Sequence, residues 1–379
     1  MAERKQIALI YDYDLNWIGG TYYILNIIRA LNFLPDEEKP QLTIFYDRFS
    51  SLVDIKKIDY PYITFISIKY RLSHLAKIIN KISLLTIRRD LITVKLPVDR
   101  VDNFYYRPFV IDKSNIGNYY CWIADLQDRY LPHFFKKREL AYRLATYKRI
   151  IRENEPIVFS SQTTLNDFNT CFPKNKNQKN VLRFVSIADN NFYSLSIADI
   201  KKKYNIVGEY FIVPNQIWKH KNHMVVLNAF TDIFKRHPDL KIVLTGKEGD
   251  YRDPNYIHEV KNFVADNNLQ DKIVFLAFID RDEQLKLMAE SIAIIQPSLF
   301  EGWSTVIEDA KLLNKCIICS DIPVHHEQLP DSNLFFNPND KNELIKLVEA
   351  VIKGQVTFKI NYNHEQAILA FARGFIALF

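Results

Sequence analysis

Cysteine is scarce in this sequence, with four residues, Cys121, Cys171, Cys316 and Cys319, in a chain of 379. Four thiols do not make a disulfide framework in a chain of this size. Long apolar runs are also missing, because none approaches the roughly 18 residues that cross a bilayer. The first apolar segment is short and is soon interrupted by acidic residues, unlike a signal peptide. We therefore expect a cytosolic protein.

The remaining composition is that of an ordinary soluble protein, with 48% hydrophobic and 25% charged residues. The length is sufficient for two α/β domains with a large core. Short β-branched or aromatic runs alternate with helical patterns along most of the chain, which is typical of parallel α/β layering. The fold class is therefore predicted to be α/β.

The domain division is predicted from a second, cleaner series of strands and helices that begins near residue 209. We expect an N-terminal Rossmann-like domain at 1–190, a second one at 191–361 and a C-terminal helix at 362–379. Two such halves would face each other across a cleft, and the active site would lie in that cleft.

Positive charge is concentrated in the first half, where residues 1–190 contain 29 Lys and Arg against 20 Asp and Glu. Residues 69–89 carry six basic residues and no acid, and their Leu and Ile residues recur at helical spacing. Such a helix could lie on an anionic membrane surface, or it could pack on a sheet with its basic face in solvent. A second basic stretch at 136–152 supports the membrane hypothesis. Neither stretch belongs to a nucleic-acid module, so no nucleic-acid partner is expected.

Two carboxylates stand eight positions apart in the segment 297–323, at Glu301 and Asp309. Thr305 and Glu308 fit an S/T-x-x-E capping box, which predicts a helix from about Val306. The free N–H groups and the dipole of that helix would face a phosphate. The pair could then hold hydroxyls on either side of a diphosphate, although an ordinary strand, loop and helix would also explain the segment.

A glycine pair, Gly19 and Gly20, follows the first predicted strand and opens a helical stretch. Its backbone could approach a ligand and present N–H groups to an anion, or it could simply make a tight turn. The pattern G-x-G-x-x-G is missing, which counts against a nicotinamide dinucleotide site.

Metal chemistry is not expected from the motifs that suggest it. Asp12 and Asp14 form a D-x-D, but at the end of the first strand beside the glycine pair. His220 and His223 lack a further ligand at suitable spacing. The C-x-x-C formed by Cys316 and Cys319 lies in a predicted strand, where positions i and i+3 point to opposite faces.

The segment 297–323 resembles the E-x7-E region of retaining, GT-B-fold glycosyltransferases of family 4, also called glycosyl transferases group 1. The resemblance implies that Glu301 binds the donor sugar and that Asp309 binds the ribose. It places the donor along the helix start, at Gly302, Trp303, Ser304 and Thr305.

The segment 212–223 resembles the family's diphosphate-binding turn. There the matching positions are Gln216, where the family has Arg, and Lys221. Lys219 or a backbone amide is expected to compensate for the neutral Gln216. The glycine pair resembles the first-domain loop that reaches the donor phosphates.

The segment around Asp125 resembles a subgroup written W-I-P-D-x-Q, with Ala124 where many members have His. Asp125 and Gln127, with Asp128 behind them, are implied as ligands of acceptor or sugar hydroxyls.

The resemblance implies a GT-B enzyme with two facing Rossmann-like domains and a last helix that crosses back to the first. It would move a hexose, with mannose preferred, from a nucleotide-sugar to a glycan or lipid-linked saccharide, as in polysaccharide or O-antigen biosynthesis. Glu301, Lys221 and Asp125 would be the catalytic residues, and no metal or other cofactor is expected. The enzyme would be cytoplasmic and could sit peripherally at the inner face of the membrane. A nucleotide-sugar epimerase or hydrolase, or an inactive scaffold of this fold, remains as an alternative.

Overall fold

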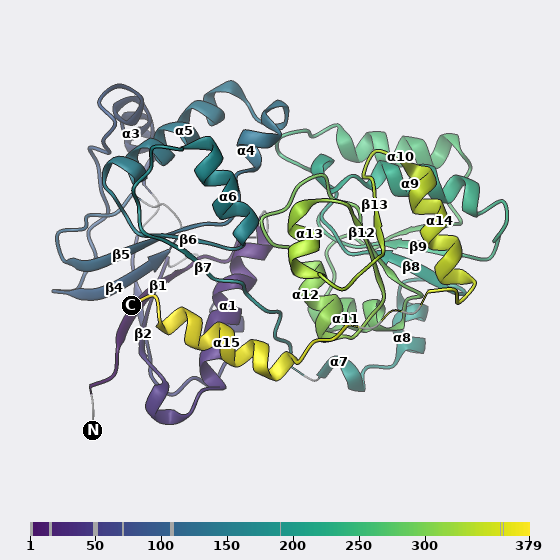
Figure 1. Ribbon diagram of the computed structural model, residues 1–379, viewed down its shortest axis with the longest axis horizontal. Coiled ribbons are helices and arrows are strands. Elements are labelled where there is room, and N and C mark those ends of the chain that lie inside the picture. The colour runs from purple at the N-terminus through teal and green to yellow at the C-terminus, as the bar shows by residue number, and fades with distance from the viewer. Residues whose placement is uncertain are drawn as a thin grey trace. The chain divides into compact units, whose positions relative to one another are not determined.

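The computed structural model describes residues 3–14, 17–47, 52–69, 72–106, 110–189, 191–356, 358 and 360–379. The chain forms two compact units (Figure 1). Unit 1 contains Met1–Ile187 and Glu365–Phe379, and unit 2 contains Ala188–His364. Each unit is built on one parallel sheet, which confirms the prediction of two Rossmann-like α/β folds.

Unit 1 has a sheet with the strand order β3-β2-β1-β4-β5-β6-β7 within its described residues. The strands are β1 (Gln6–Tyr11), β2 (Gln41–Tyr46), β3 (Ile63–Ser67), β4 (Val101–Tyr106), β5 (Ile116–Ile123), β6 (Ile157–Phe159) and β7 (Lys179–Val181). The helices are α1 (Ile18–Asn32), α2 (Val53–Lys56), α3 (His74–Thr86), α4 (Gln127–Tyr130), α5 (Lys137–Arg152), α6 (Gln162–Cys171) and α15 (His364–Ile376), with short 3₁₀ turns η1 (Asp36–Glu38) and η2 (Pro132–Phe134).

Unit 2 has the strand order β10-β9-β8-β11-β12-β13 in the part of the chain that the structure describes. The strands are β8 (Tyr210–Val213), β9 (Lys241–Leu244), β10 (Ile273–Phe275), β11 (Ile294–Gln296), β12 (Ile317–Ser320) and β13 (Phe335–Phe336). The helices are α7 (Asn191–Ser194), α8 (Ile197–Lys203), α9 (His223–Ile233), α10 (Tyr256–Asp266), α11 (Arg281–Glu290), α12 (Thr305–Leu312), α13 (Pro323–Gln328) and α14 (Lys341–Ile352), with the 3₁₀ turn η3 (Lys219–Lys221).

The sheet of unit 2 is covered on both faces, which explains why its strands are largely apolar. Successive residues of β8 point to opposite faces, so Phe211 and Val213 join the core under α9, α10 and α14. Tyr210 and Ile212 join the core under α8, α11 and α12. Because both faces are buried, binding chemistry is left to the strand ends and the loops that follow them.

Parts of unit 1 are not evident from the sequence pattern. Strand β4 was not predicted, because its sequence VDNFYY mixes polar and aromatic residues and lacks a run of β-branched ones. Helix α5 begins only at Lys137, because Pro132 starts a separate 3₁₀ turn before it.

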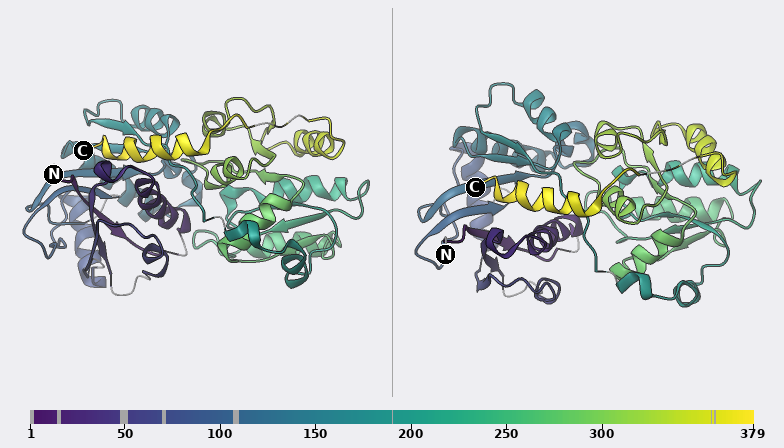
Figure 2. Two further views of the ribbon diagram at one scale, coloured as in Figure 1. Left: turned by 90° about the horizontal axis from the view of Figure 1, so that it is seen from below. Right: turned by 60° about the horizontal axis from the view of Figure 1, so that its bottom comes forward.

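Helix α15 packs on unit 1, which confirms the predicted return of the last helix to the first domain. Lys5 Nζ donates to the carbonyl of Phe379 at 2.7 Å, near the end of α15. The ring of Phe375 meets Tyr105 of β4 edge-on with centroids 5.2 Å apart, and Phe371 lies 6.4 Å from Tyr23 of α1. Figure 2 shows α15 running along unit 1, with the C-terminus close to the first strand.

Among the described residues, no helix combines the length and the apolar composition that a membrane span needs.

We expect Phe375→Ala to lower the free energy of unfolding of unit 1 by about 3 to 5 kcal/mol, because the fully buried ring leaves a cavity. The measurement is urea denaturation followed by circular dichroism. Arg373→Ala on the same helix is the control: it removes a surface ion pair with Glu38 and should hardly move the transition. Equal losses for both variants would contradict the assigned packing of α15.

Candidate active site at the ends of β8 and β11

The order of the strands in unit 2 reverses direction between β8 and β11, which are neighbours in the sheet. In an open parallel sheet, ligands bind outside the carboxyl ends of the strands at this switch point. The loop after β8 carries Gln216, Lys219 and Lys221, and the loop after β11 carries Glu301. The structure thus brings the two predicted donor-binding segments to the same edge of the sheet.

Glu301 and Lys221 are in direct contact, as an ion pair between Lys221 Nζ and Glu301 Oε1. The same oxygen accepts hydrogen bonds from Ser298 Oγ at 2.7 Å and from Gln296 Nε2 at 3.0 Å. Oε2 makes no hydrogen bond within the described part of the chain. The carboxylate is therefore oriented through one oxygen, while the other can serve a ligand.

Two buried amide side chains, Gln296 and Asn215, hold this carboxylate in place through hydrogen bonds. Gln296 is fully buried, and its Oε1 accepts a hydrogen bond of 2.7 Å from Asn215 Nδ2 at the end of β8. The backbone adds a second link, because Leu299 N donates to His220 O at 2.8 Å. The two loops are thus joined both by side chains and by main chain.

Gly246 is a further element of the site that was not predicted. Its φ is +120°, and an added Cβ would lie 2.6 Å from the carbonyl oxygen of Asn215. A side chain there would be strained and would also displace the loop after β8. The close approach of this glycine therefore fixes the path of the loop that carries Lys221.

Lys219 points to a different partner from Lys221. Its Nζ lies 2.8 Å from Asp253 Oδ2, and this carboxylate raises the pKa of Lys219. The predicted compensation for Gln216 would therefore require Lys219 to leave this ion pair. Gln216 is half-buried in the loop after β8.

His220, in this loop, is held by a buried arginine. His220 Nδ1 lies 3.0 Å from an Nη of Arg252, which is itself paired with Asp250 at 2.9 Å. Burial, together with Lys221 and Arg252, lowers the pKa of His220 well below its usual range. The neutral ring therefore accepts a hydrogen bond from Arg252 and braces the loop.

Helix α12 begins one residue earlier than the predicted capping box requires. Ser304 is the N-cap and accepts from Ile307 N, so the prediction of Thr305 as the cap was wrong. Glu308 does not reach back to the cap: its Oε1 accepts from Lys311 Nζ and from Gln328 Nε2, each at 2.9 Å. Burial raises the pKa of Glu308.

The remaining predicted residues of this helix start differ in how accessible they are. Ser304 N donates to Gln328 Oε1 at 2.9 Å, so this amide is already used. Gly302 and Trp303 are buried, and Thr305 is half-exposed. Thr305, as the first residue of α12, is therefore the member of this group best placed to meet a ligand.

Asp309 lies inside α12 and is gripped by Arg281 of α11. Arg281 Nη1 donates to Asp309 Oδ2 at 2.8 Å, and Nη2 pairs with Oδ1. The carboxylate is nearly fully buried, whereas about a fifth of the arginine side chain is exposed. Arg281 was not predicted, because no local pattern marks a residue 28 positions before its partner.

Of the candidates in unit 1, Asp125 and Gln127 follow the end of β5. Asp125 Oδ1 accepts from Gln127 N at 3.0 Å, and the aspartate remains partly exposed. Asp128 is fully buried, with Arg129 Nε at 2.8 Å and the hydroxyl of Tyr147 at 2.8 Å. Asp128 therefore has a structural task, and Asp125 is better placed to meet a ligand.

The glycine pair lies within the first turn of α1. Gly20 N donates to Trp17 O at 3.0 Å, and an added Cβ at Gly20 would collide with the indole of Trp17 at 2.4 Å. Trp17 stacks on Trp122 of β5 with centroids 5.4 Å apart. Gly20 thus makes room for an aromatic stack, and its own amide is already used in a hydrogen bond. Of the predicted glycine pair, Gly19 is therefore the residue whose amide is proposed to meet an anion.

Residues 196–369 match the family model of glycosyl transferases group 1. The second unit belongs to the glycosyl transferases group 1 family. A curated relative, the O-antigen chain mannosyltransferase RfbU of Salmonella typhimurium, is 29% identical over 160 residues, which is 41% of each chain. The match thus spans less than half of that relative's length.

Solved structures share the whole fold. Anabaena HepE in complex with UDP and glucose is similar with a TM-score of 0.68 and 14% identity, covering 99% of both chains. WaaG, a glycosyltransferase involved in lipopolysaccharide biosynthesis, is similar with a TM-score of 0.59 and 11% identity, covering 97% of this chain and 93% of that one. The fold is therefore GT-B.

In this group 1 unit, Arg281→Ala should lower the free energy of unfolding by about 3 kcal/mol, because the buried carboxylate of Asp309 loses its guanidinium partner. The double variant Arg281→Leu with Asp309→Leu should recover most of that loss, since no buried charge is left unpaired. Urea denaturation checks both. A double variant no more stable than Arg281→Ala would contradict the assigned pairing.

The stability of the group 1 unit should also fall as the pH drops from about 6.5 to about 4. His325 is fully buried, and burial lowers its pKa from 6.5 to about 4, although the nearby Glu301 carboxylate acts in the opposite direction. Between these values the unfolded chain binds a proton that the folded chain does not, so protonation favours unfolding by up to about 3 kcal/mol. Above pH 6.5 this histidine is neutral in both states, so it no longer makes the free energy of unfolding depend on pH.

The variant His325→Asn isolates this effect, because an amide can keep the hydrogen bond from His325 Nδ1 to Ser320 O, of 2.8 Å, without titrating. The difference in unfolding free energy between wild type and variant should change across this pH range. His326→Asn, at an exposed neighbour, is the control and should keep the wild-type pH dependence. An unchanged dependence in His325→Asn would contradict the assignment.

Proposed function

We propose that this protein is a retaining glycosyltransferase that moves a hexose from a nucleotide-sugar to a glycan or a lipid-linked saccharide, as in polysaccharide or O-antigen biosynthesis. The observation that carries the proposal is the contact of Lys221 with Glu301 at the switch point of a group 1 unit. A cation and an oriented carboxylate are the two groups needed beside the bond between a sugar and a diphosphate.

Lys221 is the proposed ligand of the diphosphate. An ammonium group donates three hydrogen bonds, and one of them is used by Glu301. The remaining donors can stabilise charge on the leaving phosphate as the glycosidic bond breaks. Gln216 can add neutral hydrogen bonds, and Thr305 lies at the N-terminus of α12, where the helix dipole favours an anion.

Glu301 is the proposed ligand of the sugar hydroxyls, through the Oε2 oxygen that its neighbours leave available. Asp309 is the proposed ribose ligand, in an orientation that Arg281 holds. Asp125 and Gln127 of unit 1 are proposed to bind hydroxyls of the acceptor or the sugar. No step assigned to these residues requires a metal ion.

The chemistry conserves the configuration at the anomeric carbon. The bond between that carbon and the phosphate oxygen breaks, and the acceptor hydroxyl forms a new bond on the same face. The proton of the hydroxyl passes to the departing phosphate. A protein nucleophile is not needed in this scheme.

Mannose from a GDP donor is the preferred substrate, and the partial match to the mannosyltransferase RfbU supports it. The likeness to HepE, whose structure contains UDP and glucose, concerns the fold alone. UDP, GDP, dTDP and CMP should therefore be compared in one thermal-shift screen.

We expect one nucleotide to stabilise the protein, by about 2.7 kcal/mol at a hundred times its dissociation constant. Lys221→Met should abolish the shift, because the diphosphate loses its cation. Glu301→Gln should keep the nucleotide shift and lower turnover of the nucleotide-sugar about 100-fold, because it alters the sugar contact. Lys235→Met, at an exposed lysine of the same unit, is the control and should retain the nucleotide shift.

The outcomes distinguish the alternatives. Consumption of the nucleotide-sugar without an acceptor would indicate an epimerase or a hydrolase. No stabilisation by any nucleotide would indicate an inactive scaffold. If the nucleotide stabilises Lys221→Met as much as the wild type, the proposal that Lys221 binds the diphosphate is wrong.

A further inference from the structure

Helix α3 of unit 1 is turned with its apolar side outward. Of the thirteen large hydrophobic side chains that the described residues expose, six lie between Leu75 and Leu91. Four are in the helix, Leu75, Ile78, Ile82 and Leu85, and each is 47% to 68% exposed. Scattered exposed apolar residues are ordinary, but a contiguous group of this kind marks an interaction surface.

These four residues form one stripe. At 3.6 residues per turn, positions 75, 78, 82 and 85 fall within an arc of about 80°. The buried residues Ala76, Asn80, Ser83 and Leu84 lie on the opposite side. The usual order of an amphipathic helix is therefore largely reversed, because the amide of Asn80 and the hydroxyl of Ser83 share the inward side with Ala76 and Leu84, whereas the four-residue stripe of Leu and Ile faces outward.

Hydrogen bonds hold the helix in this orientation. Asn80 Nδ2 donates to Ile92 O at 2.6 Å, while Asn80 Oδ1 accepts from Leu91 N at 3.0 Å and from Ile92 N at 2.8 Å. Ser83 Oγ donates to Arg89 O at 2.7 Å. Rotating the helix to bury its apolar stripe would break these bonds and leave buried polar groups unsatisfied. The outward stripe is thus built into the fold.

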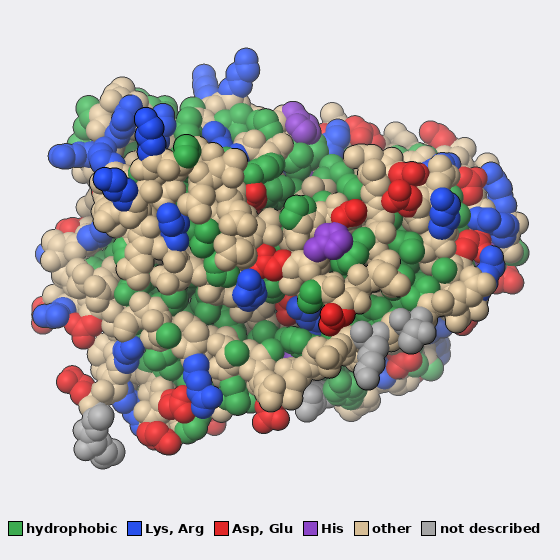
Figure 3. Space-filling model, in the orientation of Figure 1, with side chains coloured by type: hydrophobic (Ala, Val, Ile, Leu, Met, Phe, Trp, Pro, Cys, Tyr) green, Lys and Arg blue, Asp and Glu red, His purple; other side chains and the backbone are tan. Residues whose placement is uncertain are grey.

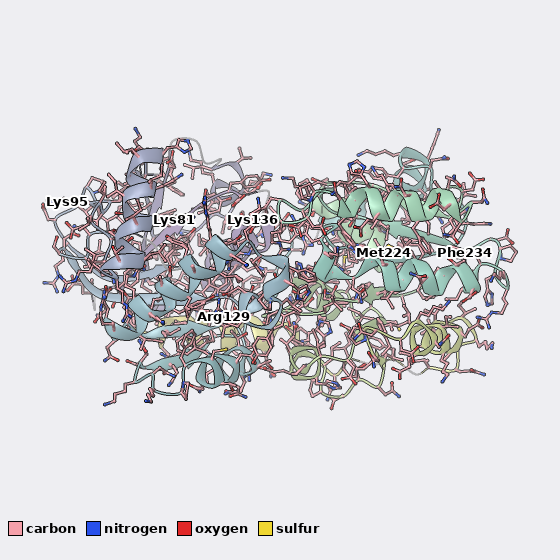
Figure 4. The ribbon with its side chains drawn as sticks, turned by 90° about the horizontal axis from the view of Figure 1, so that it is seen from above. Lys81, Lys95, Arg129, Lys136, Met224 and Phe234 are labelled. Atoms are coloured by element: carbon pink, nitrogen blue, oxygen red, sulfur yellow. The ribbon has the colours of Figure 1, made fainter. Side chains whose placement is uncertain are left out.

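Positive charge borders the stripe. Lys77 and Lys81 lie along one edge of the helical arc, and Arg88 and Arg89 follow the end of the helix. No Asp or Glu occurs in residues 69–89. In the corner of the molecule where Figure 1 places α3, Figure 3 shows apolar and basic side chains side by side. Figure 4 looks onto this side and shows Lys81 on α3, with Lys95 and Lys136 to its left and right.

The second basic stretch, 136–152, adds less exposed positive charge to this surface than its sequence suggested. Arg149 of α5 is buried against Asp90, and Arg143 and Arg152 pair with Glu139 and Glu153. Its exposed cations are at 136–138, at Lys148 and at Arg152, the last of which is paired with Glu153. Helix α3 therefore carries the main surface.

We propose that α3 docks unit 1 on an anionic lipid surface, with Leu75, Ile78 and Ile82 at the boundary of headgroups and acyl chains and Lys77 and Lys81 at the lipid phosphates. Apolar side chains flanked by lysines match the layered chemistry of such a surface, because apolar groups enter the acyl region while the ammonium groups remain with the anions. The charge of the patch favours this occupant over a second copy of the chain, since two copies would bring like charges together.

The test is sedimentation of the full chain with vesicles of phosphatidylcholine alone or of equal parts phosphatidylcholine and phosphatidylglycerol. Binding is expected to the anionic vesicles and to weaken as salt is raised. Lys77→Gln with Lys81→Gln should weaken it about fivefold per charge at low salt. Leu75→Ser with Ile78→Ser and Ile82→Ser should weaken it more than tenfold even where the charges are kept.

Val207→Ser is the matched control, because this side chain of unit 2 is also 67% exposed, and it should bind vesicles as wild type does. Circular dichroism melting checks that the triple variant folds. We expect it to fold, because the three replaced side chains are exposed and do not belong to the core. The proposal fails if the triple variant binds anionic vesicles like wild type, or if wild type binds phosphatidylcholine equally well. It also fails if no vesicle is bound and the triple variant instead converts a dimer into a monomer in analytical ultracentrifugation.

Discussion

Buried polar groups that cannot be left without partners are the constraint on which the structure of the candidate site depends. Strand β11 ends at Gln296, and Asn215 follows two residues after the end of β8; both amide side chains lie in the protein interior. An unsatisfied buried amide costs about 1 to 3 kcal/mol, so the two side chains bond to each other and onward to Glu301. The orientation of a carboxylate at the surface is therefore set by requirements of the core.

The sequence was sufficient for the architecture because both sheets follow a regular alternation of apolar strands and amphipathic helices. It also singled out Glu301 and Lys221, each in a loop that follows such a strand, and the structure brings these two side chains into contact. The sequence could not predict which side chains far apart along the chain would pair with each other. The pairing of Arg281 with Asp309, and of Gln328 with Ser304, depends on how helices pack after the sheet forms. The helix cap at Ser304 was missed by one residue, because Ser304 and Thr305 are equally good caps by type.

Helix α3 shows a different limit of sequence patterns. Its periodicity correctly indicated an amphipathic helix, but periodicity does not say which face turns inward. The usual assumption buries the apolar face. Here the hydrogen bonds of Asn80 to the loop that follows reverse that choice, and such bonds cannot be read from hydrophobic spacing.

The return of α15 to unit 1 makes unit 2 an insertion within unit 1. A ribosome would therefore complete the whole of unit 2 before it releases the helix that fills the space beside Tyr105 and Tyr23. Unit 2 is contiguous in sequence and can assemble as soon as it has emerged, whereas the earlier-made unit 1 must wait with part of its aromatic core uncovered. The half of the chain that is synthesised first is thus the half that finishes folding last.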